Sequence, residues 1–199
     1  MKKFNFKLKD LKFRKVDIQE LDDRMLLVNL YMTQGLVLLA GAVILFFQKA
    51  SFVRLFAPGN PYTVMVWGTV FALLVLASDL LISRWVPPEV TDDGGVNQRI
   101  FGNRPLWHIA LLSLVVSVCE EVLFRGAIQH AWGPYWTSIL FAAIHIRYLQ
   151  HWLMTGLVFG ISYGLGWIYL QTGSLWTPIL AHFLIDFVMG CILRYRREE

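Results

Sequence analysis

Charged residues are scarce in this chain, and their scarcity argues against an ordinary water-soluble domain. Of the 199 residues, 16% are charged, whereas soluble domains contain about 25%. Hydrophobic residues make up 56% of the chain, and the mean hydropathy is +0.52. The charges are clumped, so long uncharged tracts lie between them. The composition predicts a polytopic membrane protein with a single domain, and we expect no nucleic acid among its partners.

Cysteine is also scarce, and the spacing of Cys119 and Cys191 fits neither a disulfide framework nor a metal site. Both lie in apolar stretches, where a cysteine is usually a small buried hydrophobic residue. The sequence contains no HExxH motif, no internal repeat and no low-complexity segment. A cleaved signal peptide is not expected, because the first apolar run starts after 24 residues and lacks a small-residue cleavage site.

Six apolar runs are candidates for membrane helices. A helix rises about 1.5 Å per residue, so about 20 apolar residues cross a hydrocarbon core of about 30 Å. Only helices and closed barrels satisfy their backbone in lipid, and these runs are too long and alternate too little for barrel strands. The sequence therefore predicts an all-α fold. The expected helices are Met25–Phe47, Tyr62–Ser83, Leu106–Phe124, the shorter Pro134–Ile146, Trp152–Leu170 and Ser174–Leu193.

The distribution of lysine and arginine predicts the orientation. Cations gather in the first 24 residues, in the loop 84–105 and at the C-terminal end, whereas the opposite side would hold Lys49, Arg54 and Arg125. By the positive-inside rule, both termini face the cytoplasm. We expect an integral protein of a bacterial plasma membrane. The expected segments are a basic head (1–24), two spans with a polar loop (25–105), a helical core (106–193) and a basic tail (194–199).

The basic head alternates its cations with apolar side chains. Such a segment can lie on anionic lipid, which is therefore a candidate partner. An ordinary cytoplasmic retention signal would have the same composition, so both interpretations remain open.

Two adjacent glutamates, Glu120 and Glu121, end the third apolar run. An ionisable residue inside a span costs several kcal/mol unless it is paired, so it is a candidate for function. Glu121 and Arg125 are four residues apart and share a helix face, so Arg125 can neutralise Glu121. Glu120 points about 100° away and is left as the unpaired carboxylate, which suits a general base or acid. Alternatively, both glutamates lie in a water-exposed end of the span.

Two further apolar helices carry a histidine. Phe141 lies four residues before His145, and His182 lies four residues before Asp186. One such histidine is often a hydrogen-bonded core residue, but polar groups on three spans must face one another or a wet cavity. Their convergence predicts a hydrolytic site in which a carboxylate and a histidine deprotonate water and a second polar pair holds an oxyanion. The other candidates, expected at interfaces, span ends or a turn, are Asp79, His108, His130 and His151.

The three motifs occur in the order found in a known family. They are Glu120-Glu121-Val-Leu-Phe-Arg125, Phe141-Ala-Ala-Ile-His145 and His182-Phe-Leu-Ile-Asp186. They resemble the EExxxR, FxxxH and HxxxD/N motifs of the CPBP family, the CAAX protease and bacteriocin-processing enzymes, also called the Abi family. The resemblance covers about Leu106 to Leu193, and the first two spans add only hydrophobicity to it.

The resemblance implies an intramembrane endopeptidase. It implies that Glu120 and His145 activate the attacking water, and that His182 and Asp186 bind the oxyanion or orient the group that does. The residues implied to brace the site are Glu121, Arg125 and Phe141. In the eukaryotic member of the family, the last three residues of a prenylated protein are removed. For this chain the expected partner is a membrane-embedded or lipidated protein or peptide. The prenyl specificity of the eukaryotic member is not part of the expectation.

Asp186 departs from the prenyl protease, which has asparagine at this position. An ionised aspartate only accepts hydrogen bonds, so Asp186 would be protonated, would orient His182 or would bind a metal. Glu120, His145 and His182 could form a zinc site of two histidines and a carboxylate with an open position. Each of these ligands would come from a different helix, however. The sequence leaves both zinc and no cofactor open and slightly favours metal-free activation of water.

Two points remain open at this level. Glu120 and His182 are expected about 20 and 12 Å along their helices, in the outer half, whereas His145 lies two residues before Arg147 and should sit near the inner face. Either the fourth helix enters only partway or the orientation is wrong. The alternative function is a non-proteolytic membrane scaffold, regulator or immunity factor, with a transporter as a less favoured third option.

Overall fold

The computed structural model describes residues 22–87, 90 and 94–195. The predicted basic head, with its lipid-binding hypothesis, and most of the basic tail lie outside the described residues. The regular elements of the described chain are helices, as predicted. They are α1 (Asp23–Phe47), α2 (Phe52–Leu55), α3 (Pro61–Trp85), α5 (Val96–Phe101), α6 (Leu106–Glu121), the π-helix η3 (Val122–Ile128), α7 (Gln129–Ile144), the 3-10 helix η4 (Ile146–Tyr148), α8 (Trp152–Thr172) and α9 (Trp176–Tyr195).

Local sequence signals set several helix ends. The side chain of Asn60 accepts a hydrogen bond from the backbone N–H of Thr63, and Pro61 occupies the first turn of α3, where its missing N–H costs nothing. Helix α8 ends at Gly173, which adopts the left-handed conformation at φ 63° that glycine tolerates best. These signals set the start of α3 and the end of α8.

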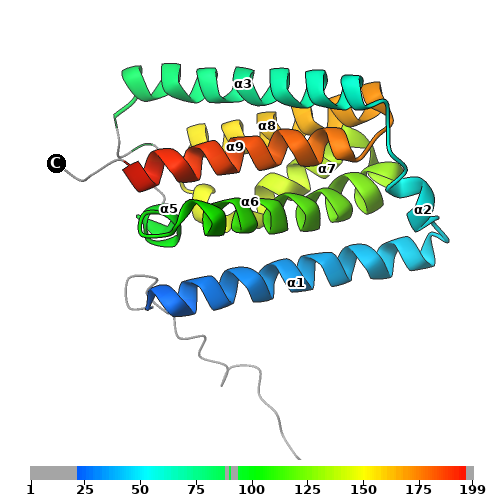
Figure 1. Ribbon diagram of the computed structural model, residues 1–199, viewed down its shortest axis with the longest axis horizontal. Helices are drawn as coiled ribbons and strands as arrows, with labels where there is room; N and C mark the ends of the chain where they lie inside the picture. Colours follow the sequence, from blue (N-terminus) through cyan, green and yellow to red (C-terminus); the bar gives the residue numbers. More distant parts are fainter. Residues whose placement is uncertain (1–21, 88–89, 91–93, 196–199) are drawn as a thin grey trace, which may run out of the picture.

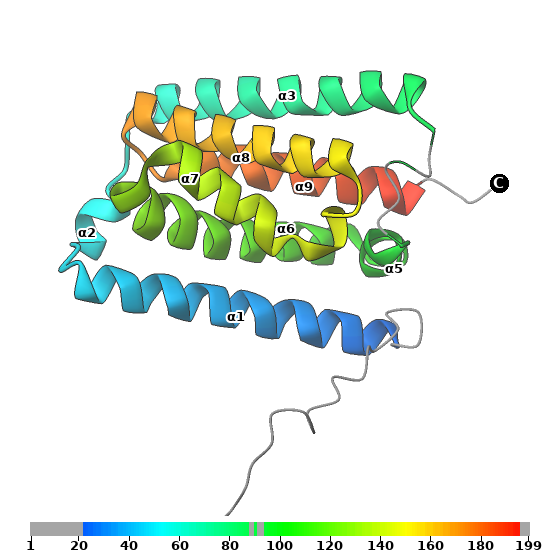
Figure 2. The same cartoon turned by 180° about the vertical axis from the view of Figure 1, so that it is seen from behind.

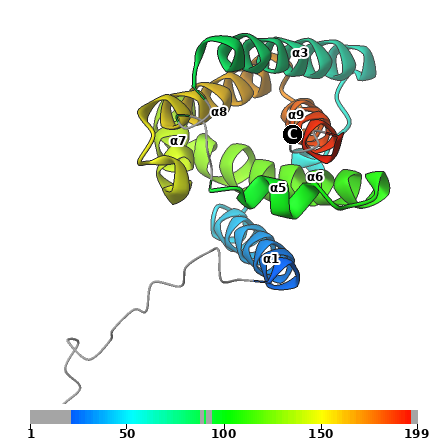
Figure 3. The ribbon, with the colours of Figure 1, turned by 90° about the vertical axis from the view of Figure 1, so that its left-hand side faces the viewer.

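The long helices form a bundle in which α1 and α3 lie on opposite outer sides and α6 to α9 lie between them (Figures 1 and 3). The outer helices expose many apolar side chains, among them Leu36, Leu39, Leu73 and Leu74. Such a surface suits lipid rather than water. Five helices of the described chain are long and apolar enough to cross a membrane. The chain is therefore an all-α, polytopic integral membrane protein, and the predicted fold class is confirmed.

The helix count needs one correction. The predicted third and fourth spans form one continuous apolar segment, Leu106–Ile144, because helical structure continues through η3 where a connector was expected. This segment is bent at Gly133, which has φ 72° and ψ 171° and is followed by Pro134. Figure 2 shows α7 running back along α6 after the bend. This reversal allows α1 to begin and α9 to end at the same end of the bundle (Figure 1). Which side of the membrane that end faces stays a prediction.

The reversal also bears on the disagreement between the depths expected for Glu120 and His145. Gly133 lies 13 residues after Glu120 and 12 residues before His145, so both residues lie about 20 Å from the bend, on its two arms. The arm Pro134–Ile144 has 11 residues, about 16 Å, and ends well before it could cross a core of about 30 Å. This arm is therefore too short to cross the core by itself, and the bend places Glu120 and His145 at similar distances along its two arms. Which face of the membrane His145 lies nearer to stays a prediction.

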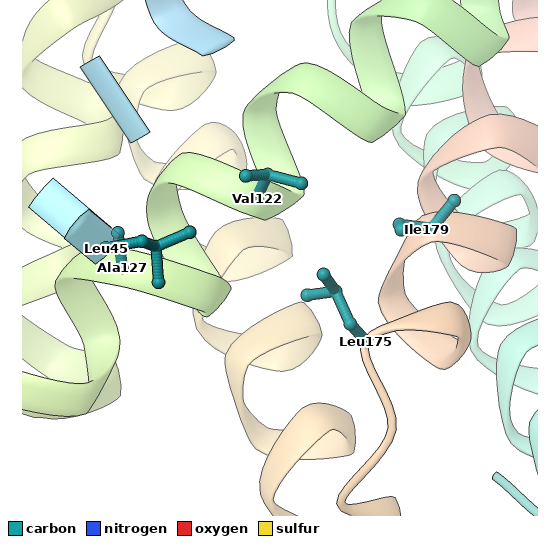
Figure 4. Packing of buried hydrophobic residues seen from close by; sticks show 5 residues of the cluster. All are labelled: Leu45, Val122, Ala127, Leu175 and Ile179. Carbon is teal, nitrogen blue, oxygen red and sulfur yellow. The ribbon is translucent and has the colours of Figure 1, made fainter. Parts of the chain in front are cut away.

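A hydrophobic cluster fixes the segment that follows the two glutamates (Figure 4). It joins the end of α1, the π-helix η3 and the start of α9, and it consists of Leu45, Val122, Ala127, Leu175 and Ile179. Helix α1 packs closely on η3, because a Cβ added at Gly41 would lie 3.2 Å from the Cα of Leu123. This packing holds the turn that carries Glu120 and Glu121 in the middle of the bundle.

Candidate functional site

Glu121 is completely buried and binds two nitrogen donors. Its Oε1 accepts hydrogen bonds from Nη1 of Arg125 at 3.0 Å and from Nδ1 of His182 at 2.8 Å. The ion pair predicted from the spacing of Glu121 and Arg125 is thus present. Arg125 is also completely buried, which corrects its earlier placement among the cations of the opposite surface. Removing either partner would leave a buried charge uncompensated, at a cost of about 3–5 kcal/mol.

Arg125 ties the segment α6–η3 to two other helices. Its Nη2 donates to the backbone oxygen of Ser162 at 2.7 Å and to the hydroxyl of the same residue at 2.9 Å, both on α8. Its guanidinium carbon lies 5.3 Å from the ring centroid of Phe141 on α7, a cation–π distance. We refer to Glu121, Arg125, Ser162 and His182 as the ion-pair cluster.

His182 bridges the ion-pair cluster and Asp186. Its Nδ1 donates to Glu121, and its Nε2 lies 3.5 Å from Oδ2 of Asp186. Because an ionised carboxylate only accepts, a ring nitrogen that faces it must carry a proton or meet a protonated acid. At 3.5 Å the two groups are within ion-pair range but farther apart than an ordinary hydrogen bond, so a proton on either group favours the contact. The side chain of Asp186 is 30% exposed, so the pair lies near a partly open side of the site.

Glu120 has different surroundings from its neighbour. Its side chain is nearly buried, with 9% of the residue exposed. Its Oε1 accepts a hydrogen bond of 3.0 Å from the amide Nε2 of Gln34 on α1. A neutral amide holds a carboxylate in place without cancelling its charge, so Glu120 keeps the capacity to take up a proton.

His145 follows the last residue of α7, at the end of the short arm. Its Nδ1 lies 2.7 Å from the backbone oxygen of Phe141. A carbonyl only accepts, so Nδ1 carries the hydrogen in the neutral ring and Nε2 is the nitrogen with the free electron pair. The ring is flanked by Phe141 at 4.6 Å and by Tyr148 at 6.1 Å between centroids. The arrangement therefore fixes the tautomer suited to a base at Nε2.

The four residues predicted to be catalytic line one cavity of about 510 Å³. This volume lies in the usual range of small-ligand sites, about 300–1,000 Å³. Asp79, which the sequence analysis assigned to an interface, also lines it. His108 lies at its span end as expected, 3.2 Å from the hydroxyl of Tyr31. The polar and ionisable residues of the wall are Asn29, Thr33, Gln34, Asp79, Asn97, Glu120, His145, Arg147, Tyr148, His182 and Asp186.

The candidate zinc ligands Glu120, His145 and His182 do not form a ready ligand set. Across residues 22–87, 90 and 94–195, no three His, Cys, Asp or Glu side chains are grouped to hold a metal ion. His182 directs one ring nitrogen to Glu121 and the other toward Asp186. The arrangement does not fit a metal bound by these three residues, and we derive no step through one.

Three features of the site were not predicted. The π-helix follows the glutamates directly, and such insertions are frequent at functional sites. Ser162 binds Arg125 from a helix 37 residues away, and no sequence signal identifies it. Gln34 binds Glu120 across 86 residues. The amides Asn29 and Gln34 within the apolar run Met25–Phe47 were the available signal for it.

Comparison with known proteins yields a family and a relative. The sequence profile of the family described as type II CAAX prenyl endopeptidase Rce1-like matches residues 102–188, the segment that contains all three motifs. The chain is 38% identical over 173 residues to the uncharacterized protein YpbD of Bacillus subtilis (strain 168), which covers 84% of this chain and 92% of that protein. No solved structure matches the chain.

Proposed function

We infer the function of this chain from its family and its site: the chain belongs to the Rce1-like family of type II CAAX prenyl endopeptidases, and we propose that it is an intramembrane endopeptidase. The observation that carries the proposal is the different environment of the two glutamates. Glu121 is neutralised by the buried Arg125, whereas Glu120 lines a cavity and is held by a neutral amide. A carboxylate kept charged among membrane helices suits a general base.

In the proposed reaction, Glu120 and His145 activate a water molecule. Glu120 takes a proton from the water, with Nε2 of His145 as a second acceptor, while the water oxygen forms a bond to the carbonyl carbon of the scissile peptide. The carbonyl oxygen becomes an oxyanion. The bond from carbon to nitrogen then breaks, and the proton held by Glu120 passes to the leaving amine. This balances the hydrolysis without a further reactant.

His182 and Asp186 are proposed to stabilise the oxyanion. Both side chains line the cavity and face each other at 3.5 Å, so a proton carried by either one could be donated to a developing negative charge. In this arrangement an ionised Asp186 does not have to donate a hydrogen bond itself, because an ionised carboxylate can only accept one. Glu121, Arg125 and Phe141 are proposed to brace the site, because their contacts fix His182 and the arm that carries His145.

The proposed substrate is a membrane-embedded or lipidated protein or peptide, because the cavity lies among helices whose outer surfaces are apolar. We propose a bacterial plasma membrane as the location, with both termini in the cytoplasm. The proposal needs no metal.

The test uses the purified chain in lipid nanodiscs with two fluorescence-quenched probes. One is a farnesylated peptide that ends in cysteine and three further residues, and the other is an unlipidated peptide with about 20 apolar residues, enough to span the disc. We expect cleavage of at least one probe by the wild-type chain and cleavage slower by about 10²-fold or more with the Glu120→Gln variant. No cleavage of either probe, or equal cleavage by both proteins, would contradict the proposal and favour a non-proteolytic scaffold.

A further inference from the structure

Gln34 is the polar residue on the buried face of α1. The buried residues of α1 are Leu26, Gln34, Gly41 and Leu45, which form the face turned toward the bundle. Gln34 is 6% exposed and lines the cavity that also contains Glu120. Burying an amide away from water is unfavourable unless it is hydrogen-bonded. A buried amide at this position therefore needs a reason that packing alone does not give.

One half of the amide has a clear partner. Nε2 of Gln34 donates to Oε1 of Glu120 at 3.0 Å. An ionised carboxylate only accepts, which assigns the amide nitrogen, rather than the oxygen, to this contact. An arginine here would hold the carboxylate but would also weaken it as a base. The amide fixes the direction of Glu120 and leaves its charge uncompensated.

The other half of the amide has no partner. Oε1 of Gln34 is buried and accepts no hydrogen bond from the residues that the structure describes. Buried acceptors are rarely left unsatisfied, and an exception calls for an explanation. The oxygen has almost no accessible surface, so the amide acts on the cavity through its nitrogen, and the unsatisfied oxygen is a cost of placing that nitrogen against Glu120.

We propose that Gln34 positions the general base. This inference rests on the proposed function. The bond from Nε2 of Gln34 holds the carboxylate of Glu120 in one direction on the cavity wall, where it accepts a proton from the attacking water. The proton that moves goes to Glu120, and Gln34 neither gains nor loses one. Gln34 is a positioning residue that lies outside the segment 102–188 matched by the family.

The test replaces Gln34 with methionine, which keeps the length of the side chain and removes both polar groups. We expect kcat for the cleaved nanodisc probe to fall about 10- to 100-fold, as for a reacting group held slightly out of place. KM should stay nearly unchanged. The matched control is Gln48→Met, which removes an amide hydrogen bond from the same helix to the backbone oxygen of Ala127 in η3. The control should leave kcat unchanged.

A double-mutant cycle separates positioning from mere stability. Groups that act as a unit show strongly non-additive kinetic effects, so Gln34→Met should cause no further loss of kcat in a Glu120→Gln background. An equal loss in both backgrounds, a change confined to KM, or an equal loss in Gln48→Met would each overturn the proposal.

A second readout keeps the inference testable if the chain cleaves neither probe. The melting temperatures of the two single variants and the double variant then measure the coupling between Gln34 and Glu120. Residues that share a hydrogen bond are expected to be non-additive. Coupling without proteolysis would refute the proposed function and the positioning role together while leaving the contact intact. Additive melting temperatures would refute the contact itself.

Discussion

Glu120 and Glu121 are neighbours in the sequence, but they belong to two different regions of the molecule. Glu121 lies in the ion-pair cluster, where Arg125 and His182 donate to one of its oxygens. Glu120 lies on the cavity wall, where the neutral amide of Gln34 donates to it. The helix turn separates the two side chains by about 100°, which is enough to give each its own set of partners.

The comparison teaches how one short motif can supply both a brace and a base. The ion-pair cluster ties α6, η3, α8 and α9 together, so its loss should act on folding. On the cavity wall, the charges of the side chains are less completely compensated by their partners. Removing these side chains should therefore lower kcat. Each prediction below changes one region and asks whether the other responds.

The largest expected effect is on the cavity side. Glu120→Gln keeps the shape of the side chain and removes the base, so we expect kcat to fall by about 10²- to 10⁴-fold, the usual contribution of general acid–base catalysis. The melting temperature in nanodiscs should change little, because Glu120 is bound by a neutral group. Cleavage of the probes and thermal unfolding are the two measurements. Activity within tenfold of the wild type would exclude Glu120 as the base.

The next effect lies in the ion-pair cluster. Arg125→Ala leaves the fully buried Glu121 without its arginine, and we expect the free energy of unfolding to fall by about 3–5 kcal/mol. Thermal unfolding and yield from membranes measure this loss. The control is Arg54→Ala on α2, which removes an exposed arginine and should change stability by no more than about 0.5 kcal/mol. A stable but inactive Arg125→Ala protein would instead indicate direct participation in the reaction.

The sequence predicts the parts of this comparison that depend on nearby residues. Apolar runs give the helices, and the spacing of four between Glu121 and Arg125 gives their ion pair, because such residues share a helix face. The same spacing places His182 near Asp186. These contacts need no knowledge of the tertiary arrangement.

The remaining parts depend on contacts between distant segments. Gln34 and Ser162 reach the site only because α1 and α8 pack beside α6 and η3, and their separations of 86 and 37 residues leave no local pattern. The position of His145 along the bundle depends on where the chain reverses. Because helical structure continues through η3, the chain reverses at Gly133 instead of directly after the predicted third span. The lone glutamine in an apolar span was the signal that could have added α1 to the site.

A smaller effect is expected from Ser162. Ser162→Ala removes one of the two bonds that the residue accepts from Arg125, and the backbone oxygen at 2.7 Å remains. The free energy of unfolding should fall by about 1 kcal/mol, with kcat unchanged. Ser78→Ala is the control, because that hydroxyl is exposed and bonds within its own helix, to the backbone oxygen of Leu74. A large loss of kcat without a loss of stability would mean that the ion-pair cluster and the cavity wall are not separate in function.

The smallest effect is expected at Asp186, where the two regions meet. Asp186→Asn keeps the size of the side chain, and its amide can donate to an oxyanion directly. We therefore expect kcat to change by no more than about two- to threefold, less than the worth of a typical hydrogen bond. A loss of tenfold or more would show that the carboxyl of Asp186 itself is needed.

A strong chelator decides between the two remaining roles of that carboxyl. If Asp186 orients His182, activity of both the wild type and Asp186→Asn should survive the chelator, and the purified protein should contain much less than one equivalent of zinc. If Asp186 binds a metal, the chelator should abolish activity, added Zn²⁺ should restore it, and Asp186→Asn should weaken metal retention and activity together. Because His182 already directs its Nδ1 to Glu121 at 2.8 Å, we expect the first outcome: the contact between His182 and Asp186, rather than a metal, connects the ion-pair cluster to the cavity wall.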